Sequence, residues 1–148
     1  MVNSISISGN LIASGSCDQF CTVWNISKKR RLYAVKNGGH VNQVQLFSPG
    51  HSFDLMISSY DGSVKVCKEG KVIQTLEHSN GCYRFQLNTE KTLLAVGYRD
   101  GLALWSTADW SKLADQKIGH IVDVHFNSTS SKVIAADRQG EVSVIDLE

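Results

Sequence analysis

At 148 residues and 42% hydrophobic content, the chain is long and apolar enough to bury a core, which excludes a fully disordered protein. Its 15 lysines and arginines balance 14 aspartates and glutamates, so no overall charge draws it to nucleic acid or to an anionic membrane. Residues 1–8 lack the basic leader and apolar core of a signal peptide, and no apolar run reaches the roughly 18 residues of a membrane span, so we expect a cytoplasmic or nuclear location.

The first predicted elements are strands. Residues 3–7 alternate polar and apolar side chains, which is typical of a strand with one buried face, and residues 8–10 (Ser-Gly-Asn) supply a turn. Residues 11–26 then read as two further strands around a polar break at Asp18 and Gln19. A basic turn, residues 28–31 (Lys-Lys-Arg-Arg), leads to an outer strand at residues 32–35.

The two-strand pattern of residues 11–26 returns at residues 55–67, 94–105 and 133–145. Its turn position is held in order by Asp18, Asp61, Asp100 and Gln139, at intervals of 43, 39 and 39 residues. This period is close to the roughly 40–45 residues of a four-stranded propeller blade. No stretch has a sustained apolar period of about 3.6 residues, so long helices are not expected. We therefore predict an all-β chain, a single segment of β-propeller blades over residues 1–36, 37–77, 78–118 and 119–148.

Four cysteines, Cys17, Cys21, Cys67 and Cys82, are too few for a disulfide-dense scaffold. Cys17 and Cys21 flank a predicted turn, which leaves a metal site as an alternative. No second pair of ligands has the spacing of a zinc site, so we expect small thiols at strand or turn positions, and no metal or other cofactor.

These motifs resemble the WD-repeat (WD40) β-propeller family. In that family a Gly-His pair precedes the first strand of a blade, a serine or threonine lies four residues before the turn aspartate, and a tryptophan follows on the third strand. The resemblance implies a structural hydrogen-bond network within the blades, here Ser14, Asp18, Trp24, His40, Asp61, Asp100, Trp105 and His120. The chain departs from the motif where Ile57 and Cys67 replace the serine and tryptophan of the second blade, and where Gln139 and Ile145 replace the aspartate and tryptophan of the fourth.

Typical members of this family have about seven blades. The last predicted blade has only three strand patterns, and the chain begins inside the first strand of another. We therefore expect a partial or incomplete ring, either a fragment of a longer propeller or a chain whose ring is completed by another chain, because exposed blade edges invite association. A four-bladed ring with a degenerate last blade is the alternative.

The function expected from this resemblance is a non-catalytic protein–protein interaction scaffold, a subunit or fragment of a larger assembly, because the motif residues have structural roles in the family and the fold alone names no chemistry. Enzymatic activity is therefore not expected. In the family's geometry, partners meet residues beside the turns and on the first strands, here Gln43, Gln45, Tyr60, Arg84, Gln86, Arg99, Asp123, His125 and Arg138. Three arginines and a tyrosine in this set make an acidic or phosphorylated peptide the first ligand to test, and a surface of ordinary solvated residues is the alternative.

An RNA- or phospho-ligand-binding propeller is the alternative function. It would use the basic run at residues 28–31, which as a turn between strands can equally be a solvated loop.

Overall fold

The computed structural model describes residues 1–147, and these contain fifteen β-strands and no α-helix. Within them there is accordingly no helical segment that could cross a bilayer. The strands form four antiparallel sheets, and the chain divides into two compact units, Met1–His78 and Ser79–Glu148. The predicted all-β fold of propeller blades is thus confirmed.

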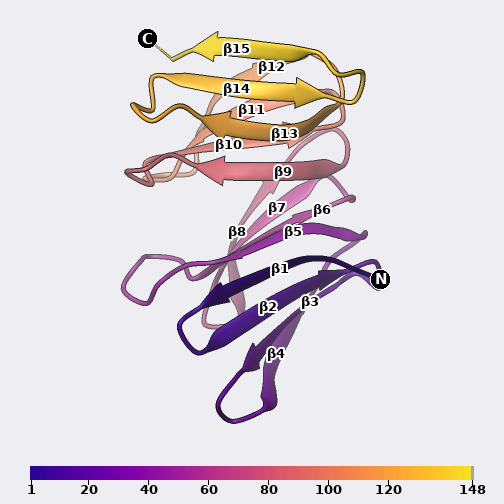
Figure 1. Cartoon of the computed structure of the whole chain (residues 1–148), viewed down its shortest axis with the longest axis vertical. Coiled ribbons are helices and arrows are strands. Elements are labelled where there is room, and N and C mark those ends of the chain that lie inside the picture. The colour runs from indigo at the N-terminus through magenta and orange to yellow at the C-terminus, as the bar shows by residue number, and fades with distance from the viewer. Residues whose placement is uncertain (148) are drawn as a thin grey trace. The chain divides into compact units, whose positions relative to one another are not determined.

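Unit 1 contains two four-stranded sheets whose strands follow one another in chain order (Figure 1). The first sheet consists of β1 (Val2–Ser8), β2 (Leu11–Ser16), β3 (Phe20–Asn25) and β4 (Arg30–Lys36). The second consists of β5 (Val41–Leu46), β6 (Leu55–Ser59), β7 (Ser63–Lys68) and β8 (Lys71–Glu77).

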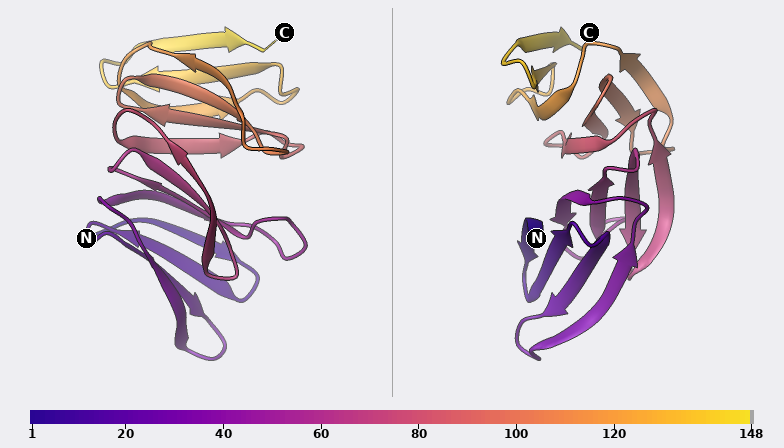
Figure 2. Two further views of the ribbon diagram at one scale, coloured as in Figure 1. Left: turned by 180° about the vertical axis from the view of Figure 1, so that it is seen from behind. Right: turned by 90° about the vertical axis from the view of Figure 1, so that its right-hand side faces the viewer.

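Unit 2 contains a four-stranded and a three-stranded sheet, which are seen from two further directions in Figure 2. The third sheet consists of β9 (Cys82–Leu87), β10 (Leu93–Tyr98), β11 (Gly101–Ser106) and β12 (Lys112–Gln116). The fourth consists of β13 (Ile121–Phe126), β14 (Lys132–Asp137) and β15 (Val142–Asp146). In every sheet the repeated sequence pattern forms the second and third strands, as predicted.

The four sheets share one register, so residues can be matched between them. Each first strand pairs with the second through a bulge near its start, for example between Val2 and Ser4 and between Ile121 and Asp123. Ile5, Val44, Phe85 and Val124 are therefore equivalent positions in the four sheets.

Within each unit, one face of the earlier sheet packs on one face of the later sheet. We call the face of the earlier sheet that makes this contact its trailing face, and the face of the later sheet that makes it the leading face. Equivalent faces of the other sheets have the same names. In unit 1 the trailing face of the first sheet and the leading face of the second form one buried cluster: Ala13, Cys21, Val23, Val35, Val41, Val44, Leu46, Leu55, Ile57 and Cys67. The corresponding cluster of unit 2 is Ala95, Leu102, Ile121, Val124, Val133 and Ala135. Alternation of side chains along each strand puts these apolar residues on the same face.

The sheets approach most closely where the second strand carries a glycine. A Cβ atom added to Gly15 would lie 2.4 Å from Val41 Cγ1 and 2.9 Å from Val44 Cγ1. At the equivalent Gly97, it would lie 2.6 Å from Ile121 Cγ2 and 3.1 Å from Val124 Cγ1. Since carbon atoms do not approach so closely, the spacing of the sheets in both units depends on the missing side chain.

We therefore expect Gly15→Ala and Gly97→Ala each to destabilise the fold by about 1–3 kcal/mol, because the added methyl group overpacks a buried interface. Urea unfolding of each variant would measure this change. Gly9→Asn is the control, since Gly9 has nothing within 4 Å of an added Cβ and a φ of +55° that asparagine tolerates. Unfolding midpoints that are the same in all three variants would contradict the packing described.

Candidate functional site

The turn between β6 and β7 is built around the carboxylate of Asp61. Its Oδ1 accepts hydrogen bonds from the Ser63 amide at 2.9 Å and the Ser63 hydroxyl at 2.6 Å, and its Oδ2 accepts one from the Gly38 amide at 2.7 Å. Ser59 supports the turn, because its hydroxyl accepts the Asp61 N–H and donates to the Gly39 carbonyl. Partial burial opposes ionisation of Asp61, but these hydrogen bonds outweigh it and hold the pKa of the carboxyl below its usual value.

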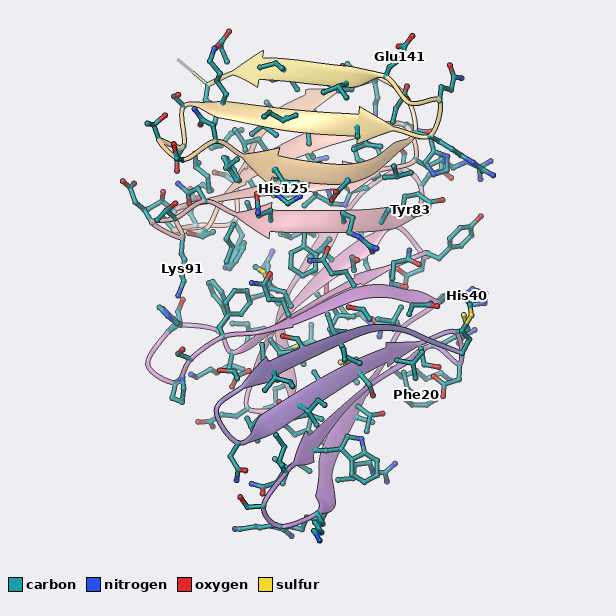
Figure 3. All side chains as sticks on the ribbon, in the orientation of Figure 1. Phe20, His40, Tyr83, Lys91, His125 and Glu141 are labelled. Carbon is teal, nitrogen blue, oxygen red and sulfur yellow. The ribbon has the colours of Figure 1, made fainter. Side chains whose placement is uncertain are left out.

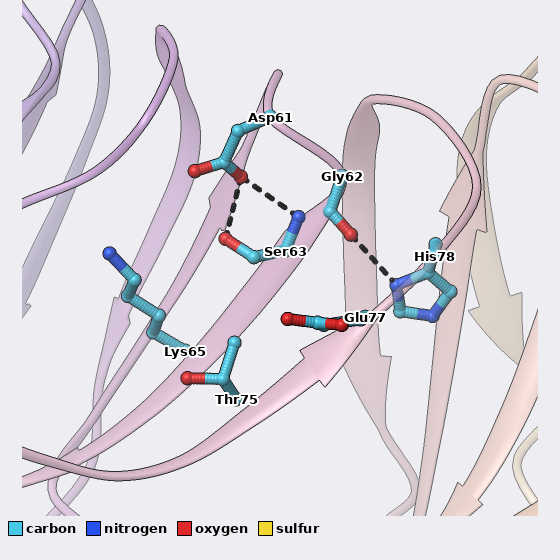
Figure 4. Close-up of a pocket in the computed structure, with 7 residues that line it drawn as sticks. All are labelled: Asp61, Gly62, Ser63, Lys65, Thr75, Glu77 and His78. Carbon is cyan, nitrogen blue, oxygen red and sulfur yellow. Dashed lines mark hydrogen bonds between the residues drawn. The ribbon is translucent and has the colours of Figure 1, made fainter.

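A polar cavity of about 430 Å³ lies beside this turn (Figure 4). Asp61, Gly62, Ser63, Lys65, Thr75, Glu77 and His78 line it. Several of these groups are already engaged in the fold: His78 Nδ1 lies 3.2 Å from the Gly62 carbonyl, and Lys65 Nζ donates to the Lys36 carbonyl at 2.7 Å. The cavity therefore consists of groups that fix the turn and the outer strand, and we assign no chemistry to it.

The turns of the first and third sheets use related bonds. Asp18 accepts the Phe20 N–H at 3.0 Å, and the Ser16 hydroxyl accepts the Asp18 N–H at 3.3 Å. Asp100 accepts the Ser79 hydroxyl at 2.6 Å and the Asn80 side-chain amide at 2.9 Å, which lowers the pKa of its carboxyl. The serines that contact the turns, Ser16 and Ser59, lie two residues before the aspartate, whereas the family motif had directed us to Ser14, four residues before it.

The corresponding turn of the fourth sheet is held by Asp137, a residue that the family motif does not indicate. Asp137 Oδ1 accepts the N–H groups of Gln139 at 2.9 Å and Glu141 at 2.8 Å. Asp137 lies two residues before Gln139, which occupies the usual aspartate position. An aspartate that bonds to the amide two residues ahead is a local turn signal, so it could have been found in the sequence.

Three of the remaining motif residues lie near aromatic or cationic neighbours. The His40 ring lies 6.2 Å from the Tyr60 ring, and the His120 ring lies 4.5 Å from the Tyr83 ring. Trp105 is buried with Lys112 Nζ 5.0 Å from its ring, whereas Trp24 is exposed. The two tryptophans thus have different environments despite equivalent positions.

Cys17 and Cys21 lie in different environments, since Cys17 is half-buried and Cys21 is buried. Cys17 Sγ accepts a hydrogen bond from Asn3 at 3.3 Å. Burial and then the neighbouring Cys67 raise the pKa of Cys21 to about 12, which keeps this thiol protonated. Among residues 1–147 no group of three or more His, Cys, Asp or Glu side chains could hold a metal ion.

Two arginines and a histidine lie within electrostatic reach of one another in unit 2. Arg99 and Arg138 are exposed beside their turns, and the backbone N–H of Arg138 donates to the His120 carbonyl at 2.9 Å. Burial, followed by the charges of Arg138 and Arg99, lowers the pKa of His120. His120 is therefore neutral near pH 7 and lies within the electrostatic reach of both arginines.

Other predicted partner-binding residues are near this group or in unit 1. Arg84 is exposed on β9, where its guanidinium donates to the Tyr83 carbonyl at 3.1 Å. In unit 1, Tyr60 is exposed and its N–H donates to the His40 carbonyl at 2.8 Å, while Gln43 and Gln45 are half-buried. Of these predicted residues, Arg99 and Arg138 are the pair that the structure brings within electrostatic reach of the same histidine.

Gln86 and His125 connect the two sheets of unit 2. Gln86 Oε1 accepts the Phe126 N–H at 2.6 Å, and its Nε2 lies 3.1 Å from His125 Nδ1. Figure 3 shows His125 between β9 and β13, and its Nε2 lies 3.4 Å from Asp123. In unit 1 the hydroxyls of Ser4 and Ser6 accept the N–H groups of Val44 and Leu46 in the same way. This linking role was not predicted from the sequence.

The depressed pKa of Asp61 makes the turn a source of acid sensitivity. A carboxyl whose pKa is lower in the folded chain stabilises it above the unfolded pKa near 4, and this stabilisation is lost as the pH falls through the folded pKa. We expect Asp61→Asn to cost about 1–3 kcal/mol at pH 7, and the difference from wild type to shrink at pH 3. Urea unfolding at the two pH values measures this, with Glu90→Gln, an exposed carboxylate, as the control. A difference that is equal at both pH values would contradict the role given to the charge.

Comparisons with known proteins agree with this geometry. A model of the family described as "WD domain, G-beta repeat" matches residues 1–25 and 31–68. THO complex subunit 3 of Arabidopsis thaliana is 33% identical over 98 residues, which are 62% of this chain and 31% of that protein. The match thus spans about a third of the length of that relative.

Two solved structures share the fold. The computationally designed Ika4 protein superposes with a TM-score of 0.82 at 20% identity, over 100% of this chain and 92% of that chain. The computationally designed Ika8 protein gives 0.85 at 20% identity, over 99% of this chain and 46% of that chain. Residues 1–25 and 31–68 thus match WD40 repeats, and the repeated sheets with their shared register give the described chain the fold of β-propeller blades.

Proposed function

We propose that the chain is a non-catalytic protein-interaction module that works as a subunit of a larger assembly. The match of residues 1–25 and 31–68 to WD40 repeats and the similarity to a protein named as a complex subunit support this. The arrangement of the turn residues supports it too, since the carboxylates of Asp18, Asp61, Asp100 and Asp137 accept hydrogen bonds that fix turns. The chain would then bind a partner through side chains exposed on its surface.

We further propose that the partner of unit 2 is an acidic or phosphorylated peptide. The observation that carries this is the grouping of Arg99, Arg138 and His120: both arginines are exposed, the Arg138 N–H donates to the His120 carbonyl, and burial followed by the two arginine charges lowers the pKa of the histidine. Arg84 on β9 adds a third guanidinium to the same unit. Guanidinium groups bind carboxylates and phosphates through paired hydrogen bonds, so this group matches a multiply charged anionic segment.

The test is an array of acidic peptides in phosphorylated and unphosphorylated forms, probed with wild type and with Arg84→Glu/Arg99→Glu/Arg138→Glu. We expect wild type to select anionic peptides, with binding that weakens as salt is added, and the triple variant to lose at least about tenfold in affinity. Fluorescence anisotropy then measures the affinity of each protein for the selected peptides.

The matched control is Lys28→Glu/Lys29→Glu/Arg30→Glu, which makes the same change of charge in the basic turn of unit 1. If this variant loses peptide binding and the unit 2 variant does not, the assignment to unit 2 is wrong. Retention of wild type on an RNA column that is lost only in the residue 28–30 variant would favour the RNA-binding alternative instead. Equal melting temperatures of the variants exclude unfolding as the cause.

A further inference from the structure

A second cavity of unit 1, with a volume of about 360 Å³, lies apart from the turn aspartates described above. Its apolar wall is formed by Leu11, Tyr33, Leu46, Phe47 and Pro49. Pockets that bind small ligands have volumes of about 300–1,000 Å³ and combine apolar walls with a few polar groups. This cavity, which we call the apolar cavity, therefore has the size and the wall of a binding site.

The apolar cavity exists because the second sheet departs from the third and fourth directly after its first strand. The residue at this position is Phe47, whereas Asn88 and Asn127 occupy it in the other two sheets. The two asparagine side chains accept backbone N–H groups and close short connections. The connection over residues 47–54 is the longest of the three (Figure 1), and the ring of Phe47 packs edge-on at 5.1 Å from that of Phe53. An apolar ring thus replaces a turn-closing amide.

Tyr33 forms another part of the wall and is held in place by the turn between β7 and β8. A Cβ atom added to Gly70 in this turn would lie 3.0 Å from Tyr33 Cγ. Burial, followed by the charge of Asp54, raises the pKa of Tyr33 to about 12, so its phenol stays protonated near neutral pH. The negative charge of Asp54 therefore acts within the cavity that both residues line.

The carboxylate of Asp54 is only partly satisfied by the fold. Its Oδ2 accepts the Glu69 N–H at 2.8 Å, whereas its buried Oδ1 accepts no hydrogen bond from residues 1–147. The ammonium group of Lys68, which also lines the cavity, donates to the His51 carbonyl at 2.9 Å. With Glu69, the lining carries two carboxylates and one ammonium group. A buried carboxylate oxygen without a partner is costly, and its field is strong because water does not screen it.

We propose that the apolar cavity binds the side chain of a lysine from a protein partner, with the aliphatic stem on the apolar wall and the ammonium group directed to Asp54. Lysine suits such a site because its stem packs on apolar surface while its charge remains at one end. A guanidinium group suits it less, because it pairs with both oxygens of a carboxylate and Asp54 Oδ2 is already occupied. This goes beyond the peptide-binding function proposed above, since it concerns unit 1 and a partner group of the opposite charge.

The test is an NMR titration of the isotope-labelled chain with N-acetyl-lysine methylamide. We expect the amide signals of Gly9, Phe47 and Glu69 to shift with a Kd of about 1 mM, which is the scale for a ligand of this size. N-acetyl-norleucine methylamide has an apolar stem without the ammonium group, and it should bind at least about tenfold more weakly. The corresponding arginine derivative should also bind more weakly than the lysine derivative.

The matching variant is Asp54→Asn, which removes the charge and keeps an oxygen that can accept the Glu69 N–H. Its affinity for the lysine derivative should fall at least about tenfold. Glu90→Gln, which removes an exposed negative charge in unit 2, is the control and should bind as wild type does. The amide spectrum also reports whether each variant is folded. If Asp54→Asn is not, the comparison of the lysine and norleucine derivatives on wild type still decides.

The two proposals fail separately. Arg84→Glu/Arg99→Glu/Arg138→Glu should bind the lysine derivative as wild type does, and Asp54→Asn should still bind the anionic peptides. A random peptide library, selected on wild type and depleted on Asp54→Asn, tests the partner. Lysine should be enriched at one position of the retained peptides, and enrichment of arginine or of apolar residues in its place would contradict the assignment.

Three further results would overturn the proposal. The first is the absence of shifts at these amides up to about 20 mM of the lysine derivative, well above the expected Kd. The second is equal affinity for the lysine and norleucine derivatives, which would indicate an apolar pocket without selection for charge. The third is an Asp54→Asn variant that binds the lysine derivative as tightly as wild type.

Discussion

The close packing of one sheet face on the next is the constraint on which both units depend. Two sheets that carry branched aliphatic side chains can pack this tightly only where one strand leaves room, and Gly15 and Gly97 supply it. The tight fit also brings polar side chains within reach of the N–H groups on the neighbouring first strand, which would otherwise lack a partner in the sheet. Ser4, Ser6 and Gln86 satisfy these groups, so apolar packing and hydrogen bonding are met by the same geometry.

The turns follow a second constraint, which is the need to pair amide groups in a tight reversal of the chain. In the second sheet, both carboxylate oxygens of Asp61 accept amide N–H groups of the turn region. In the fourth sheet, the carboxylate of Asp137 does so, although Asp137 lies two positions before the usual aspartate position of the repeat. The residue that supplies the oxygen therefore varies, while the bonds that the turn requires do not. For this reason the His and Asp residues of the repeats are understood better as parts of turns than as candidates for catalysis.

A formal net charge of only +1 is compatible with a local charge pattern in this chain. The turns of unit 2 expose Arg99 and Arg138, and the same register in unit 1 exposes Tyr60. One backbone geometry thus presents different side chains at equivalent positions, since the turn fixes only the main chain. Repeats that share one fold can therefore display a surface that differs from one repeat to the next.

The amino-acid sequence by itself determined the strands and their grouping, because alternation of apolar residues and the recurrence of Asp18, Asp61 and Asp100 are local and periodic signals. The sequence also indicated that arginines lie beside the turns, because their positions follow from the position of each turn residue. These predictions needed no knowledge of which residues meet across sheets.

Only the tertiary structure decided what each equivalent position does. Trp24 and Trp105 hold the same place in the repeat, yet one is exposed and the other is buried. Gln86 was expected at a partner-binding face, and the structure shows that it is also bonded to the next sheet. The physical reason is that burial and pairing between sheets depend on the neighbouring face, which lies about forty residues away in the chain and leaves no periodic trace in the segment itself.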